Sequence, residues 1–318
     1  MRRFDRTALF AAVALTLAAG IAIAQNKSNI DSGDQGFTDT PLLPGLSWHV
    51  HDPARPHPKA VTPGAQPGQP PSDAVILFDG RDLSRWTAAR LGTAAYTVRS
   101  DPAPWKVGNG YFEVVPRSGD IASKEKFGDV QLHVEWMEPA DVNGSSQNRG
   151  NSGVFLMGLF EIQVLDSFRS RTYADGQAGA MYGQWPPLVN AVRPPGEWQS
   201  YDIVFDAPEY TGEKLIRPAS MTVLLNGVLL HNHKEEMGPT IYRQVPKYVA
   251  GPSEGPIVLQ DHGAPVRFRN IWVRRLSGYD APEKQVQAAV RFPVRYSTDR
   301  TTTAATMAAT TNHHSVLV

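Results

Sequence analysis

The segment Gln131-Leu-His-Val-Glu-Trp136 alternates polar and apolar side chains. A period of two is typical of a β-strand with one buried face. The same period recurs in residues 201–205 and 221–225, and Asn226-Gly227 follows the second run. Asn-Gly is the preferred dipeptide of a two-residue hairpin turn, so we expect residues 228–230 to begin the returning strand.

Two later segments, residues 257–259 and 266–274, predict further strands, and Gly or Pro separates nearly all of these runs. No stretch shows helical periodicity over three turns. Short strands with turn residues between them are typical of sandwiches and jelly rolls. The sequence therefore predicts an all-β fold, a jelly-roll β-sandwich of two antiparallel sheets.

The N-terminus has the layout of a secretory signal peptide. Arg2, Arg3 and Arg6 precede an apolar run over residues 8–23, and Ala22-Ile-Ala24 supplies a small-residue cleavage site. We expect residues 1–24 to be removed and the protein to be exported, to the periplasm or the exterior. The apolar run is short for a bilayer span, and no membrane span is expected after cleavage.

The composition limits both the partners and the extent of the fold. The chain has no cysteine, and its 31 basic side chains equal its 31 acidic ones. A domain without disulfides needs a sizeable core, and a balanced charge gives no reason to expect nucleic acid as a partner.

Two segments are expected to lie outside the folded domain. Residues 25–72 are rich in Pro and Gly and poor in aliphatic side chains. They cannot bury enough apolar surface to offset their ordering entropy, which predicts a disordered linker. A disordered tail is expected over residues 279–318. The remaining residues, 73–278, suit one β-sandwich domain.

The segment Glu161-Ile-Gln-Val-Leu-Asp166 is the most informative about chemistry. Alternation places Glu161 and Gln163 on one strand face, and Asp166 joins them only if a bulge adds one residue. The spacing resembles the Glu-x-Asp-x-x-Glu catalytic strand of sandwich-fold β-glucanases, with two of the three positions changed. Retaining glycosidases need two carboxyl groups about 5 Å apart, so the segment disfavours that mechanism. A solvated polar face is the alternative.

A second polar segment, Gln260-Asp-His-Gly263, follows an apolar strand, and strand ends often carry functional side chains. His262 is a candidate general base because imidazole titrates near neutral pH, although a lone histidine is as often structural. Turn-rich segments contain three further candidates, which could bind a sugar or serve the turn or the core instead: Asn151, Tyr182 and Trp198.

Taken in chain order, several segments resemble the 3-keto-disaccharide hydrolase family, whose members are concanavalin A-like sandwiches. They cover essentially the whole folded region and are Leu77-Phe-Asp-Gly80, Phe127-Gly-Asp-Val-Gln-Leu-His-Val-Glu135, Asn151-Ser-Gly153, Glu161-Ile-Gln-Val-Leu-Asp166, Gly179-Ala-Met-Tyr182, Pro195-Gly-Glu-Trp198, Gly255-Pro-Ile-Val-Leu-Gln-Asp-His262 and Phe268-Arg-Asn-Ile271. The resemblance implies action on a disaccharide or glycoside whose C3 hydroxyl has been oxidised to a ketone.

That ketone implies a route to cleavage. It acidifies the C2 proton, so a base can remove it and the enolate can expel the C1 substituent before water adds. The route needs a base, an acid and a stabiliser of the enolate oxygen. We assign His262 as the base, either Glu135 or Glu161 as the acid, and Arg269 or a metal as the stabiliser. The residues expected to bind the substrate are Asn151, Gln163, Asp166, Tyr182, Trp198 and Gln260.

Two alternatives stay open at this point. Glu135, His262 and the pair Glu161/Asp166 could form a mixed oxygen and nitrogen site for a divalent metal; no other cofactor is expected. The chain could also be a non-catalytic, lectin-like carbohydrate-binding module, because the same sandwich serves both roles. Convergence of His262, Arg269 and the acidic strand in one cleft favours the enzyme.

Overall fold

The computed structural model describes residues 36–91 and 96–280. The predicted signal peptide and nearly all of the predicted tail lie outside these residues, so both stay predictions. The chain divides into a unit that ends at Ala281 and a second unit, Pro282–Val318, which is outside the described residues.

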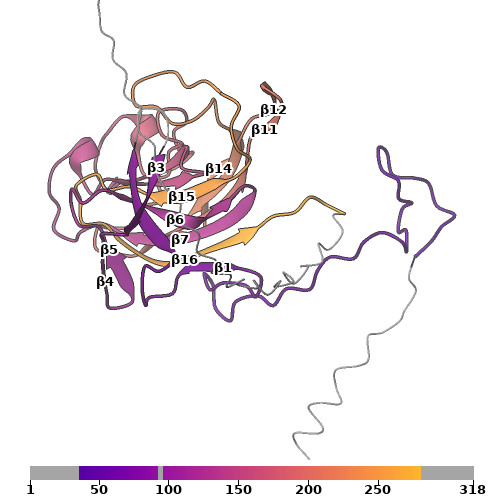
Figure 1. Cartoon of the computed structure of the whole chain (residues 1–318), viewed down its shortest axis with the longest axis horizontal. Helices are drawn as coiled ribbons and strands as arrows, with labels where there is room; N and C mark the ends of the chain where they lie inside the picture. Colours follow the sequence, from indigo (N-terminus) through magenta and orange to yellow (C-terminus); the bar gives the residue numbers. More distant parts are fainter. Residues whose placement is uncertain (1–35, 92–95, 281–318) are drawn as a thin grey trace, which may run out of the picture. The chain divides into compact units, whose positions relative to one another are not determined.

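The described residues form strands and two short 3-10 helices (Figure 1). The elements are β1 (Val75–Phe78), β2 (Trp86–Leu91), β3 (Tyr96–Pro102), β4 (Lys106–Gly108), β5 (Tyr111–Glu113), β6 (Asp120–Phe127), β7 (Val130–Met137), η1 (Ser146–Asn148), β8 (Ser152–Leu156), β9 (Phe160–Val164), η2 (Ala174–Gly176), β10 (Gln199–Asp206), β11 (Glu209–Thr211), β12 (Lys214–Arg217), β13 (Ser220–Leu225), β14 (Val228–Glu235), β15 (Gly255–Leu259) and β16 (Arg267–Arg275). In this part of the chain no helix has the length and apolar character needed to cross a membrane.

Two antiparallel sheets make up the sandwich (Figure 1). The eight-stranded sheet has the order β14-β13-β10-β7-β16-β5-β4, with β1 also paired to β16. The six-stranded sheet has the order β3-β2-β6-β15-β8-β9, and β11 pairs with β12 separately. The predicted all-β jelly-roll sandwich is confirmed.

Alternation along the strands builds one core between the sheets. Leu132, Val134 and Trp136 of β7 and Ile162 and Val164 of β9 are fully buried in the same cluster. Burying a side chain of this size contributes about 1.5–3 kcal/mol. Because period two sends the intervening residues to the other side, this core decides which side chains each sheet presents on its outer face.

The predicted hairpin at Asn226-Gly227 is confirmed. Leu225 and Val228 are register partners in the β13–β14 pair. Asn226 has a φ of 54° and Gly227 a φ of 79°. Two positive φ values in a two-residue loop match the twist of the flanking strands, and Asn and Gly adopt them most readily.

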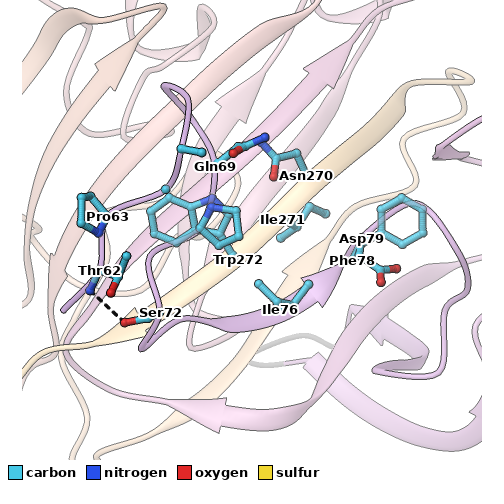
Figure 2. A pocket seen from close by; sticks show the side chains of 13 residues that line it. Thr62, Pro63, Gln69, Ser72, Ile76, Phe78, Asp79, Asn270, Ile271 and Trp272 are labelled. Carbon is cyan, nitrogen blue, oxygen red and sulfur yellow. Dashed lines mark hydrogen bonds between the residues drawn. The ribbon is translucent and has the colours of Figure 1, made fainter. Parts of the chain in front are cut away.

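Part of the predicted linker lies against the sandwich. We call residues 62–72 the strap. Its ends are joined, because Ser72 N–H donates to Thr62 O at 2.9 Å and Thr62 N–H donates to Ser72 Oγ at 3.0 Å (Figure 2). At its tip, Gly68 O accepts a hydrogen bond of 2.9 Å from Trp272 Nε1. Asn270 Nδ2 donates to the same oxygen at 2.8 Å, so two side chains of β16 contact the strap at Gly68.

Candidate functional site

The outer face of the six-stranded sheet carries polar side chains around Glu161. Glu161 and Gln163 project outward from β9, because Ile162 between them lies in the core. The register of β8 pairs Glu161 with Phe155 and Gln163 with Gly153. Phe155 belongs to a small apolar cluster separate from the main core, as expected for an outer face.

Glu161 is a buried carboxyl, with 5 % of its surface exposed. Gly153 makes room for it, since a Cβ at that position would lie 2.5 Å from Glu161 Oε1. Burial, and after it the negative charge of Asp120 on β6, raises the pKa of Glu161 to about 8. The carboxyl therefore holds its proton at neutral pH and can donate it as an acid.

Two tyrosines lie beside Glu161. Ile162 and Met181 form an isolated bridge, and Tyr182 N–H donates to Glu161 O at 3.1 Å. Directly opposite residues of an antiparallel pair share a face. Because Met181 points into the core, Tyr182 lies on the outer face with Glu161. The Tyr182 hydroxyl is 2.6 Å from the Tyr173 hydroxyl.

Gln163 and Asn151 meet at Gln147. Gln163 Nε2 donates to Gln147 Oε1 at 2.9 Å, and Asn151 Nδ2 donates to Gln147 O at 2.7 Å. Gln163 Oε1 is buried and has no hydrogen-bond partner among the described residues. Buried acceptors are normally satisfied, and this oxygen is one of the unpaired buried atoms among the described residues.

Gln260 and His262 lie on the turn that follows β15. Gln260 has the strand parity of Val258, whose side chain lies in the outer apolar cluster. Asp261 N–H donates to Asp120 Oδ1 at 2.8 Å, which ties the turn to β6. His262 follows as an exposed residue.

Asp166 has a different environment from Glu161. The β8–β9 register runs without a bulge to Val164, and Val164 and Leu165 both lie in the core, so the extra residue needed to align Asp166 comes directly after β9. Arg149 Nε donates to Asp166 Oδ2 at 2.6 Å, and Phe168 N–H donates to Oδ1 at 3.1 Å. Both oxygens are engaged within the fold rather than presented to a substrate, which differs from the predicted role.

Glu135 and Arg269 lie on the outer face of the eight-stranded sheet. They are register partners in β7 and β16, and Arg269 Nε donates to Glu135 Oε2 at 2.6 Å. His133 lies on this face with Nδ1 2.7 Å from Asp202 Oδ1. Burial raises the pKa of Glu135, but the His133 imidazole 3.7 Å away and hydrogen bonds from Asn270 and Arg269 outweigh it and lower the pKa to about 2. Glu135 is ionised at neutral pH and cannot serve as the acid.

Aromatic rings and the strap surround this second cluster. The Arg269 guanidinium lies 4.0 Å from the centre of the Trp198 ring, and Trp272 stacks on His133 at 5.3 Å. A groove of about 540 Å³ runs between the strap and strands β1 and β16 (Figure 2). Its one acidic lining residue is the exposed Asp79, and none of its lining residues belongs to the Glu161 face. We therefore place the candidate active site at the protonated carboxyl rather than at this groove.

The predicted catalytic residues are thus divided between two faces with the core between them. Arg269 and the acidic strand do not converge in one cleft, so this criterion does not favour the enzyme over the lectin-like module. The residues on or beside the six-stranded face are Glu161, Gln163, Asn151, Tyr182, Gln260 and His262, and those on the eight-stranded face are Glu135, Arg269 and Trp198.

The proposed metal-ligand set is divided in the same way. Glu135 lies on one sheet, whereas Glu161 and the stem of the His262 turn lie on the other. Within residues 36–91 and 96–280, no three His, Asp or Glu side chains are grouped as metal ligands.

Three residues near Glu161 escaped the sequence analysis. Asp120 lies on β6 and Tyr96 on β3 of the same sheet as Glu161. Tyr96 packs edge-on against Phe155, the register partner of Glu161, with the ring centroids 5.0 Å apart. No local pattern marks them, because β3, β6 and β9 are far apart in the chain. Tyr173 stands in the same loop as Tyr182, nine positions earlier, and a second tyrosine there was a detectable signal.

The fold and the protonated carboxyl do not by themselves define a function, and the comparisons with known proteins supply the class, a glycosyl hydrolase-like or lyase-like sandwich. The chain belongs to the family of the 3-keto-alpha-glucoside-1,2-lyase-like domain, whose profile matches residues 73–274. The resemblance to the 3-keto-disaccharide hydrolase family is confirmed.

Similar proteins are also found among solved structures. The chain is 42% identical to a candidate glycosyl hydrolase from Parabacteroides distasonis solved at 2.13 Å, with a TM-score of 0.65, covering 74% of this chain and 100% of that chain. A second candidate glycosyl hydrolase from that organism, solved at 1.70 Å, is 21% identical with a TM-score of 0.46, covering 64% of this chain and 94% of that chain. No curated protein shows a significant match.

Proposed function

We propose that this protein cleaves 3-keto-glycosides by elimination across C1 and C2 followed by hydration. The observation that carries the proposal is the Glu161 carboxyl, whose pKa of about 8 keeps it protonated beside groups able to bind sugar hydroxyls. The family match supports a sugar substrate, and the family's description supports the 3-keto class. The N-terminal arginines and apolar run support export.

The reaction has three balanced steps. A base removes the C2 proton, and the electron pair of the C–H bond passes to the C3 oxygen as an enolate. The enolate re-forms the ketone, a C1–C2 double bond forms, and the C1–O bond breaks while an acid protonates the leaving oxygen. Water then adds its oxygen to C1 and a proton to C2. The net result is hydrolysis, and no carboxylate nucleophile is required.

Glu161 takes the role of the acid. A general acid must hold its proton at the working pH and release it as the leaving oxygen gains charge. Glu161 meets the first condition through burial, and its counterpart Glu135 does not, because its pKa is about 2. The change at Gln163, where glucanases have a carboxylate, fits a route that needs one acid rather than a carboxylate pair.

His262 takes the role of the base, and amides position the sugar. His262 is exposed on the turn held to Asp120, and imidazole accepts a proton near neutral pH. Gln163 is buried next to Glu161 on β9, and its Nε2 donates to Gln147 Oε1 at 2.9 Å. Asn151 supports Gln163 through their shared partner Gln147.

The test uses a 3-keto disaccharide and its unoxidised parent in deuterated water, followed by NMR. We expect cleavage of the keto sugar alone, with deuterium incorporated at C2. Replacing His262 by Ala should slow that incorporation by about 10²–10⁴-fold. If His262→Ala incorporates deuterium and cleaves the keto sugar at the wild-type rates, His262 is not the base. Binding of both sugars without turnover or exchange would contradict the enzyme proposal and favour the lectin-like module.

A further inference from the structure

The proposed reaction needs a group that stabilises the enolate oxygen. The sequence suggested Arg269, but Arg269 is paired with Glu135 on the opposite sheet. In such reactions a hydrogen-bond donor aimed at the developing oxyanion is usually a large part of the rate enhancement. The donor should therefore come from the face that carries Glu161.

Tyr173 and Tyr182 form a hydroxyl pair on that face, which we call the tyrosine pair. The bridge between Ile162 and Met181 holds Tyr182 opposite Glu161. Tyr173 is held by its packing on Gly176, where an added Cβ would lie 2.0 Å from Tyr173 Cε2. The two rings are edge-on, with centroids 6.2 Å apart and an interplanar angle of 67°. Both hydroxyls are thus positioned by the fold.

The tyrosine pair has one hydroxyl hydrogen that is not used in the bond between its two hydroxyls. The hydroxyls are 2.6 Å apart, so one donates to the other and one O–H hydrogen remains. Neither hydroxyl has another hydrogen-bond partner among the described residues. A hydroxyl that already accepts a hydrogen bond is also a stronger donor, because chains of hydrogen bonds polarise one another.

The tyrosine pair is also accessible and protonated. Tyr173 is 45 % exposed and Tyr182 is half-buried. Burial raises the pKa of both phenols, and for Tyr182 the hydrogen bond with Tyr173 and the nearby acid Glu161 act in the same direction. A phenol that stays protonated acts as a donor rather than as a base.

We propose that the tyrosine pair donates its free hydrogen to the C3 oxygen of the keto sugar and stabilises the enolate that forms there. This inference rests on the proposed function. The C2 proton still passes to the base, and the electron pair passes to the C3 oxygen. The phenols keep their protons throughout and contribute a hydrogen bond that strengthens as the oxygen gains charge.

The test compares Tyr182→Phe with Tyr111→Phe on the 3-keto disaccharide. Tyr111 lies on β5 of the other sheet, so its variant controls for loss of a phenol. We expect Tyr182→Phe to lower kcat by about 10²-fold with little change in KM. Exchange of the C2 proton for deuterium should slow in parallel, while the melting temperature stays at the wild-type value. Tyr111→Phe should match the wild type in all four measurements.

The outcomes separate this inference from the proposed function. If the wild type turns over the keto sugar and Tyr182→Phe has the same kcat, the role of the tyrosine pair is overturned and the proposed function stands. A raised KM with an unchanged kcat in Tyr182→Phe has the same meaning. No turnover or C2 exchange by the wild type overturns the proposed function and the inference with it. If Tyr182→Phe unfolds, Tyr173→Phe decides, because it also breaks the bond between the two hydroxyls: a fall in kcat is expected, and an unchanged kcat contradicts the pair.

Discussion

Glu161 and Glu135 project from the outer faces of opposite sheets, and their surroundings shift their pKa values in opposite directions. Glu161 is buried beside the acid Asp120, and its pKa rises to about 8. Glu135 is also partly buried, but the nearby His133 imidazole and hydrogen bonds from Asn270 and Arg269 lower its pKa to about 2. One face therefore holds a proton donor and the other a fixed anion. The difference teaches that the neighbours of a glutamate, rather than its presence in a polar strand, decide what it can do.

Replacing Glu161 and Glu135 by glutamine, one at a time, tests the comparison most directly. Glu161→Gln removes the acid while keeping the shape, so kcat on a 3-keto disaccharide should fall by about 10²–10⁴-fold. Glu135→Gln should leave kcat near the wild-type value and lower thermal stability, because it removes the carboxylate between His133 and Arg269. Steady-state kinetics and thermal melts measure both variants. A larger loss of kcat in Glu135→Gln than in Glu161→Gln would reverse the assignment of the faces.

Gly153→Ala tests whether the space around Glu161 matters. The added Cβ would lie 2.5 Å from Glu161 Oε1, so the carboxyl has to move. A misplacement on the order of 1 Å can cost about 10²-fold in rate, and we expect a fall in kcat of that size. Gly108→Ala on β4 is the matched control, because no atom lies within 4 Å of its added Cβ. Equal kinetics for the two variants would contradict the close packing of the acid.

The pH dependence of kcat should reflect the raised pKa of Glu161. The acid must be protonated, so kcat should fall by about tenfold per pH unit as the pH rises above about 8. A pH–rate profile of the wild type measures this limb. The same limb should be absent from the residual activity of Glu161→Gln. A profile that already declines above pH 5 would mean that the carboxyl has an ordinary pKa.

The smallest effect concerns stability on the other face. Burial lowers the pKa of His133, but Asp202 and Glu135 outweigh it and raise the pKa to about 9, above the ordinary value of 6.5. This contribution to stability is full below pH 6.5 and is lost as the pH rises through 9. The unfolding free energy of the wild type minus that of His133→Gln should shrink by about 2–3 kcal/mol between pH 6 and pH 9.5. Urea titrations at the two pH values measure this difference in unfolding free energy. A difference that does not change with pH would contradict the interaction of His133 with Asp202 and Glu135.

Much of the fold could be predicted from local sequence. Alternation in residues 131–136 and the Asn226-Gly227 turn identified real strands and a real hairpin. Alternation also placed Glu161 and Gln163 on one face of a strand. These features depend only on near neighbours in the chain, which the sequence displays directly.

The division of the site between faces could not be predicted in that way. Glu135 and Glu161 both alternate with apolar residues, and nothing local says that β7 and β9 belong to different sheets. The environment of Glu161 depends on Asp120 through the order β6-β15-β8-β9, and that of Glu135 depends on Arg269 across β7 and β16. Long-range pairing therefore decides both pKa values.

The central claim is that Glu161 holds its proton at neutral pH, and an NMR titration tests it most directly. Carboxyl ¹³C shifts of glutamate-labelled protein would be followed from pH 3 to pH 10, with Glu161→Gln used to assign the signal. The account predicts that the Glu161 signal titrates near pH 8. A midpoint near 4.5, the ordinary value for a glutamate, would contradict it.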